Sequence, residues 1–127
     1  MIELDLKYFT PKEAKNTLPL VKKIVSDILI TGFLLKSLTD ALNGNIAQND
    51  EIKALVNKLS DYLAELEEIG CFYKDWDFSV GMVDFPSRID GRDVYLCWRG
   101  DEEDILFYHT IEDGYHGRKP IPQEYFV

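Results

Sequence analysis

The chain has 127 residues, of which 46% are apolar and 29% are charged, and its formal net charge is −9. This length and composition predict one soluble domain, residues 1–127, that can bury a core without metal or disulfide support. No apolar run approaches the roughly 20 residues that cross a bilayer, and residues 1–15 lack the basic-then-apolar order of a signal peptide. We therefore expect a cytoplasmic protein with no membrane partner.

The cysteine usage argues against a disulfide framework, and the charge balance argues against a nucleic-acid-binding protein. Cys71 and Cys97 are the only cysteines and form no CxxC pair, so we expect buried, reduced thiols. The chain carries 23 acidic against 14 basic residues, and no concentrated basic stripe interrupts this excess. Because such a field repels phosphate backbones, we expect no nucleic-acid partner.

A long amphipathic helix is predicted to begin after Thr10. Residues 10–13, Thr-Pro-Lys-Glu, form a capping box with proline at the first helical position. Apolar residues then recur close to a heptad seam at Ala14, Leu18, Val21, Val25, Ile28, Leu35 and Leu42. Pro19 lies inside this pattern and is expected to kink or divide the helix, which should end at Asn43-Gly44-Asn45.

The same helix carries a second apolar row, which consists of Leu20, Ile24, Leu34 and Leu38, with Ile30 and Phe33 nearby. A single partner helix cannot cover so wide an apolar stripe. We therefore expect both a sheet and a second subunit to bury it, which favours a homo-oligomer through this helix.

A second helix is predicted to begin with Asn49 or Asp50 as its cap and to end at Gly70 in a left-handed conformation. Its apolar stripe consists of Ile52, Leu55, Val56, Leu59, Tyr62, Leu63, Leu66 and Ile69. Two such helices joined by a short polar loop favour an antiparallel helical hairpin over residues 10–70.

After Gly70 the apolar period changes to two, which predicts an antiparallel sheet of about three to four strands over residues 71–110 and an irregular tail over 111–127. Asp90-Gly91 fits a two-residue hairpin turn that pairs Ile89 with Arg92, Phe85 with Leu96, Asp84 with Cys97 and Val83 with Trp98. A second turn near Gly100-Asp101 would pair Leu96 with Ile105, Val94 with Phe107 and Arg92 with His109.

Strand alternation in this register assigns side chains to two faces of the sheet. The face against the helices would hold Val83, Phe85, Val94, Leu96, Trp98, Ile105 and Phe107. The mixed aromatic and polar face, where we expect a ligand or partner, would hold Asp84, Arg88, Asp93, Tyr95, Cys97, Leu106 and Tyr108. The predicted fold class is α+β, with a long antiparallel helical hairpin packed on one face of a small antiparallel sheet.

His109 is the first candidate for chemistry. The predicted register places it at the end of the helix-facing side, opposite Arg92, where it would be structural and bonded to a carbonyl or to a carboxylate such as Glu112. The alternative is a ligand or general base at the rim of the sheet. With Glu112 and His116 it forms an HxxEDxxH string that could hold a divalent metal, although the string runs into a loop instead of a helix.

The other candidate groups favour structural interpretations. Alternation directs Cys97 away from His109 and beside Asp84, which indicates a packed thiol instead of a nucleophile. Arginine forks can hold small anions. However, acidic residues alternate with the basic group Arg88, Arg92, Arg99, Arg118 and Lys119, so internal pairing is the simpler interpretation. A carboxylate pair from Asp84, Asp93 and Glu102 could serve acid–base chemistry, but nothing in the sequence indicates that these groups are desolvated.

Several motifs together resemble one family. They are FTPKEAKNTLP, a helical hairpin that ends in ELEEIG, GMVDFPSRIDGRDVYLCW and DILFYHTIEDGYHGRKP. The most specific pieces are VDFP at 83–86, VYLCW at 94–98 and the YH…G..GR.P pattern from Tyr108 to Pro120. Over nearly its whole length the chain resembles the prokaryotic family of domain of unknown function 2203. The resemblance implies a small cytoplasmic protein with a helical hairpin and a sheet, and it transfers no catalytic role because that family has no assigned activity.

Two functional hypotheses follow. The first is a non-enzymatic, self-associating interaction module, a homodimer through the first helix. The alternative is a protein, enzymatic or not, that binds a small ligand, such as a small anion, or a divalent metal at a rim of Arg92, His109, Glu112, His116 and Arg118. In that alternative Arg92, His109, Glu112 and Arg118 would bind the ligand, and His109, Glu112 and His116 would bind a metal. We favour the first, with no enzymatic activity, and leave the cofactor open.

Overall fold

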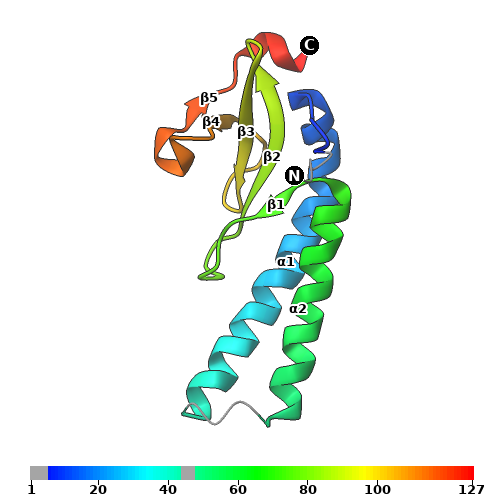
Figure 1. Ribbon diagram of the computed structural model, residues 1–127, viewed down its shortest axis with the longest axis vertical. Helices are drawn as coiled ribbons and strands as arrows, with labels where there is room; N and C mark the ends of the chain where they lie inside the picture. The colour runs from blue at the N-terminus through cyan, green and yellow to red at the C-terminus, as the bar shows by residue number, and fades with distance from the viewer. Residues whose placement is uncertain (1–5, 44–47) are drawn as a thin grey trace, which may run out of the picture.

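Two long helices form the predicted hairpin, α1 (Pro11–Ala41) and α2 (Asp50–Ile69), and lie side by side along the molecule (Figure 1). The computed structural model describes residues 6–43 and 48–127. The predicted capping box is confirmed, since the Thr10 side chain accepts from the Glu13 N–H at 3.1 Å and the Glu13 carboxylate accepts from the Thr10 N–H at 2.8 Å. The helix continues through Pro19, so the predicted division was wrong.

The ends of the hairpin follow local signals. Helix α1 ends at Ala41, slightly before the predicted end at Asn43-Gly44-Asn45. Gly44 and Asn45 lie outside the described residues. Asn49 caps α2 by accepting the Ile52 N–H at 2.9 Å, and Gly70 ends it at a φ of 110°, a left-handed conformation. Within residues 6–43 and 48–127, neither helix is long and apolar enough to cross a membrane.

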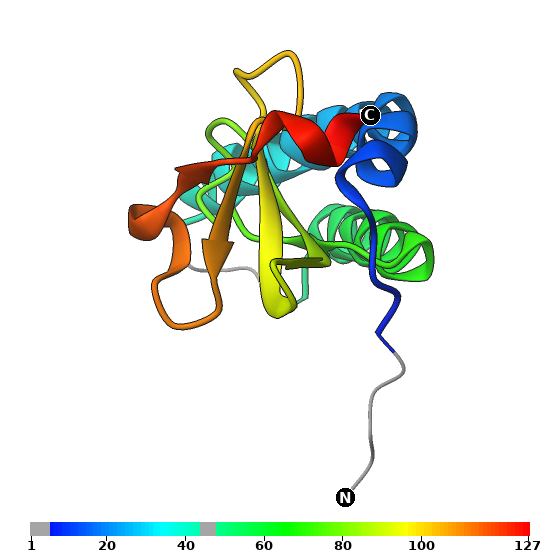
Figure 2. The same cartoon turned by 90° about the horizontal axis from the view of Figure 1, so that it is seen from above.

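The sheet has five antiparallel strands instead of three to four. They are β1 (Phe72–Tyr73), β2 (Met82–Ile89), β3 (Arg92–Arg99), β4 (Phe107–Thr110) and β5 (Lys119–Pro120), in that spatial order. The fifth strand comes from the segment predicted to be an irregular tail, which also contains short 3₁₀ turns at Gly114–Gly117 and Gln123–Phe126. One face of the sheet lies against one end of the helical hairpin, and the other end of the hairpin projects beyond it (Figures 1 and 2).

The β2–β3 hairpin has the predicted register. Asp84 pairs with Cys97, Phe85 pairs with Leu96, and the turn residues Asp90 and Gly91 have φ values of 53° and 76°. Positive φ at both positions is what a type I′ turn requires. The predicted helix-facing residues Val83, Phe85, Val94, Leu96, Trp98 and Ile105 all belong to the buried core.

The predicted β3–β4 register was wrong. The partner of Val94 is Thr110 instead of Phe107, a shift of three residues, and an odd shift exchanges the two faces of a strand. Phe107 and His109 therefore lie on the face away from the helices, and Tyr108 packs against the core in their place. The physical reason is the loop 100–106 between these strands, which is not a tight turn.

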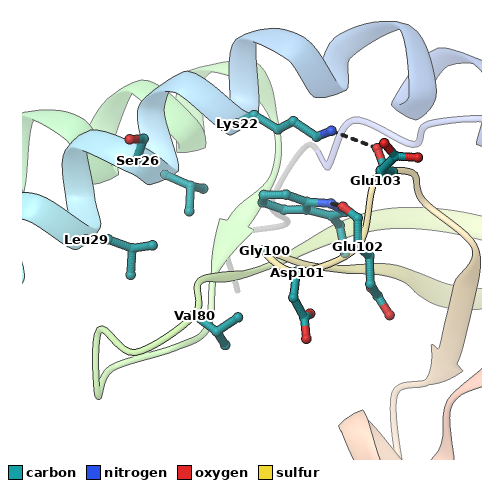
Figure 3. Close-up of a pocket in the computed structure, with 10 residues that line it drawn as sticks. Lys22, Ser26, Leu29, Val80, Gly100, Asp101, Glu102 and Glu103 are labelled. Atoms are coloured by element: carbon teal, nitrogen blue, oxygen red, sulfur yellow. Dashed lines mark hydrogen bonds between the residues drawn. The ribbon is translucent and has the colours of Figure 1, made fainter.

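Contacts with α1 and with the end of β3 hold this loop in place. The Lys22 ammonium of α1 donates to the Glu103 carbonyl at 2.7 Å (Figure 3). The Trp98 indole N–H donates to the Glu102 carbonyl at 2.8 Å. The Arg99 N–H donates to the Glu102 carboxylate at 2.9 Å. These bonds fix where β4 begins, and with it the face on which His109 lies.

Candidate metal centre

Three potential metal ligands converge on the sheet face away from the helices. Asp84 of β2, Cys97 of β3 and His109 of β4 place a carboxylate oxygen, the thiol sulfur and a ring nitrogen within 4.8 Å of one another. Their exposed fractions are 5%, 0% and 5%. Within residues 6–43 and 48–127 no other group of three such side chains could hold a metal ion.

The strand register explains this convergence. Asp84 and Cys97 are direct partners across β2 and β3, and His109 pairs with Tyr95, two positions from Cys97 on the same face. Direct cross-strand partners have Cβ atoms about 4.5–5.5 Å apart, and diagonal neighbours remain within reach of longer side chains. Three adjacent strands thus hold the three ligand atoms on a rigid surface.

The hydrogen bonds of His109 assign its protons. Its Nδ1 lies 2.8 Å from the Thr110 carbonyl oxygen, which can only accept, so Nδ1 carries a proton and donates it. Its Nε2 lies 3.2 Å from Oδ1 of Asp84. The hydrogen bond to Asp84, and then that to Cys97, raises the pKa of His109 to about 10. Without a metal, the imidazole is therefore a cation at neutral pH, paired with the Asp84 carboxylate.

The same geometry fits a metal ion in place of the Nε2 proton. Thiolate, imidazole and carboxylate are all zinc ligands, and three protein ligands with one further position is the arrangement of catalytic zinc sites. A metal-bound histidine usually donates its other ring N–H to a carbonyl or carboxylate, as Nδ1 of His109 does to Thr110. Two anionic ligands, Asp84 and Cys97, would balance the charge of a divalent ion in this buried position.

A cavity of about 600 Å³ opens onto this group. Its lining includes Asp84 and His109 together with Lys74, Met82, Tyr95, Ile111, Gly114 and Tyr115. The Tyr95 ring lies beside the imidazole, with 5.7 Å between the ring centroids. A small molecule in the cavity would therefore reach two of the three ligand residues directly.

The structure does not bring together the ligands that the sequence predicts. Of the predicted metal set, only His109 belongs to the converging group, and Glu112 and His116 are exposed in the loop and turn beyond β4. Arg92, a predicted ligand-binding residue, is exposed at the start of β3, where alternation directs it to the face opposite Cys97.

Arg118, another predicted ligand-binding residue, is engaged in an internal network. Its Nη2 donates to both carboxylate oxygens of Glu102, at 2.7 and 2.9 Å, and to the Cys97 carbonyl at 3.0 Å. The guanidinium also stacks on Phe107, 4.3 Å from the ring centroid. Arg118 thus positions the strand that carries Cys97.

Asp84 and Cys97 are the members that the sequence analysis did not assign to a site with His109. The predicted β2–β3 register paired Asp84 with Cys97 correctly. The predicted β3–β4 register, which directed Cys97 and His109 to opposite faces, was wrong. One signal was available. The most specific motifs, VDFP, VYLCW and YH…G..GR.P, contribute Asp84, Cys97 and His109, one residue each.

Comparison with known proteins gives one match. A family model described as "Uncharacterized conserved protein (DUF2203)" matches residues 7–121, which include all three converging side chains. Neither the comparison with curated proteins nor that with solved structures gave a match.

Proposed function

Because the chain belongs to the DUF2203 family, whose description names no activity, we propose a function from the side chains themselves: the protein binds one divalent transition metal through Asp84, Cys97 and His109. The observation that carries this proposal is the convergence of three buried ligand atoms within 4.8 Å. Zinc fits the donor set best, because it accepts sulfur, nitrogen and oxygen ligands in one site.

The burial of the three groups supports this assignment. A carboxylate and an imidazole are costly to bury unless they are paired or bind a metal, and a thiol needs neither partner nor charge to be buried. The Asp84–His109 ion pair satisfies the carboxylate and the imidazole, and Cys97 adds only a hydrogen bond to the imidazole. A metal ion would use all three, and the cavity beside them would admit a further ligand from solution.

Metal content tests the proposal directly. Protein purified without chelator, and then equilibrated with zinc and dialysed, is expected to hold about one zinc per chain by inductively coupled plasma mass spectrometry. His109→Ala removes a ligand and should hold almost none. His116→Ala, at the exposed histidine, is the matched control and should bind zinc like the wild type. Equal zinc content in wild type and His109→Ala, or no zinc in either, would overturn the proposal. Asp84→Asn provides a second test if His109→Ala does not fold.

A second candidate function, self-association through α1, is favoured by its exposed apolar side chains. Of the second apolar row, the fold buries Ile24, but Ile30, Phe33 and Leu34 are 58%, 66% and 48% exposed. The buried residues of α1 end at Gly32, and the far end of the helix projects beyond the sheet (Figure 1). We propose that a second copy of the chain covers this projecting part, as the sequence analysis expected.

The charge of the two helices supports a copy of the same chain as the occupant. Within its bounds α1 carries five basic and three acidic residues, and α2 carries two basic and six acidic residues. An apolar groove of about 380 Å³ also runs between them, lined by Leu34, Ser37, Leu38, Ala41, Glu51 and Leu55. In a two-fold dimer the basic helix of each copy can lie against the acidic helix of the other.

Leu34→Asp tests this surface. The variant is expected to weaken dimerisation by at least about tenfold, because it buries an unpaired charge in the apolar contact. Sedimentation equilibrium over a concentration series measures the change. Ile111→Ser, which removes another exposed apolar side chain, from the loop after β4, should leave the dimer unchanged. A wild-type protein that stays monomeric up to millimolar concentration would contradict the proposal.

A further inference from the structure

We infer that the cavity beside Asp84 and His109 binds small molecules that carry an oxyanion, a carboxylate or a phosphate, with Lys74 and Tyr115 as donors. This inference rests on the proposed metal site, because the metal would bind one oxygen of the anion. It adds to that site the chemical class of its ligand.

The position of Lys74 is the first argument. Its N–H donates to the Met82 carbonyl at 2.8 Å, one position beyond the pair of Tyr73 with Val83. Alternation therefore directs Lys74 to the same sheet face as Asp84, and it lines the cavity. It is the single lysine or arginine in that lining.

The charge of Lys74 has no carboxylate partner in the part of the chain that the structure describes. The nearest acid in sequence, Asp75, is engaged elsewhere. Its carboxylate accepts the backbone N–H groups of Ser79, Val80 and Gly81 at 3.0, 2.9 and 2.8 Å. In a chain with a net charge of −9, an unpaired lysine at the edge of a cavity favours an anion as its partner.

The tyrosines supply further donors. The Tyr115 hydroxyl accepts from Nη1 of Arg99 at 2.8 Å, so its own hydrogen remains available to a ligand. Asp84 is the single carboxylate in the lining, and in the proposed site both it and His109 bind the metal. The remaining polar side chains, Lys74, Tyr95 and Tyr115, can all donate hydrogen bonds. The apolar side chains Met82 and Ile111 leave room for a short carbon chain.

Charge counting gives the same preference. A divalent metal with the Asp84 carboxylate and the Cys97 thiolate is neutral, and Lys74 adds one positive charge to the cavity. A cavity of about 600 Å³ is within the range of small-molecule sites, roughly 300–1,000 Å³. A metabolite with one oxyanion group therefore matches both its charge and its size.

Cobalt substitution tests metal binding and anion binding separately. Co²⁺ bound by a thiolate gives visible absorption bands, which report on metal binding without any assay of activity. Acetate and phosphate are then titrated in separate experiments. A shift of the bands with acetate assigns a carboxylate ligand, and a shift with phosphate assigns a phosphate ligand. Either shift supports the inference.

Two lysine variants define the role of the ammonium group. Lys74→Met is expected to bind Co²⁺ like the wild type but to weaken the binding of the anion by about tenfold, as loss of a charge-assisted hydrogen bond predicts. Lys58→Met, on the exposed face of α2, is the control and should change neither the binding of Co²⁺ nor that of the anion. Tyr115→Phe should weaken the binding of the anion and leave the binding of Co²⁺ unchanged.

The outcomes are distinct. Cobalt bands that respond to neither anion would overturn the oxyanion inference and leave the metal site intact. Equal anion affinity in Lys74→Met and Lys58→Met would overturn the role of Lys74. Absence of the cobalt bands themselves would overturn the metal site and, with it, this inference.

Discussion

Raising the pH of the metal-free protein from about 6 to about 10 is expected to lower its free energy of unfolding by on the order of 4 kcal/mol. The pKa of His109 is raised to about 10 in the folded protein, chiefly by its hydrogen bond with Asp84, and returns to its ordinary value of 6.5 on unfolding. Because the folded state holds this proton more tightly, the stabilisation is complete below pH 6.5. It is lost progressively as the pH rises towards 10.

Urea denaturation of chelator-treated protein across this range measures the effect. His109→Gln removes the titrating group, so the difference between wild type and variant isolates its contribution from those of other groups, such as the buried thiol of Cys71, whose pKa burial raises. His116→Ala, at the exposed histidine, should follow the wild-type profile. If the free energy of unfolding depends on pH equally in wild type and His109→Gln, Asp84 and His109 do not form the ion pair.

Zinc is expected to reverse the sign of this dependence. Metal binding needs a bare Nε2 on His109 and a thiolate on Cys97, so protons compete with the metal. The zinc-loaded protein should therefore be least stable at acidic pH, where its ligands are protonated, and should keep its stability between pH 7 and 9. The same ion pair that stabilises the metal-free protein opposes metal binding at every pH below about 10, the pKa of His109, because the metal must displace the proton on Nε2.

The parts of the fold that depend on local signals could be predicted from sequence. The capping box at Thr10 and Glu13 and the left-handed Gly70 mark helix ends through contacts within a few residues. Asp90-Gly91 fixes the β2–β3 register in the same way, because a two-residue turn allows only one pairing of its strands.

The candidate site could not be predicted, because it depends on the register of β3 and β4. The loop 100–106 sets that register through contacts that no local pattern reveals, from Lys22 on α1 and from Arg118 before β5. An error of three residues moved His109 to the wrong face and separated it from Asp84 and Cys97. The strand Lys119–Pro120 is too short to show a period of its own.

The network around Glu102 is therefore as important to the site as the ligands themselves. Glu102 joins the N–H of Arg99 at the end of β3 to the guanidinium of Arg118 before β5. Arg118 in turn donates to the carbonyl of Cys97. The network connects both ends of the segment 99–118 that carries His109, so its loss should affect the geometry of Cys97 and His109.

Glu102→Ala is expected to lower the free energy of unfolding by about 3 kcal/mol, because it leaves the Arg118 guanidinium buried without its carboxylate. The side chains of Arg118 and Glu102 are only 13% and 17% exposed, so solvent compensates little of this loss. The neighbouring Glu103→Ala is the matched control. Its side chain is exposed, and its carbonyl, which accepts from Lys22, is retained, so a change within about 0.5 kcal/mol is expected.

Chemical denaturation of the single variants and of Glu102→Ala/Arg118→Met separates the two contributions of the ion pair. The double variant removes both charges, so it should recover part of the stability that Glu102→Ala loses. It should still bind zinc more weakly than the wild type, because Arg118 no longer holds the Cys97 carbonyl. Similar small losses for Glu102→Ala and Glu103→Ala would contradict this account, and the register of β4 would then depend on the Lys22 contact instead.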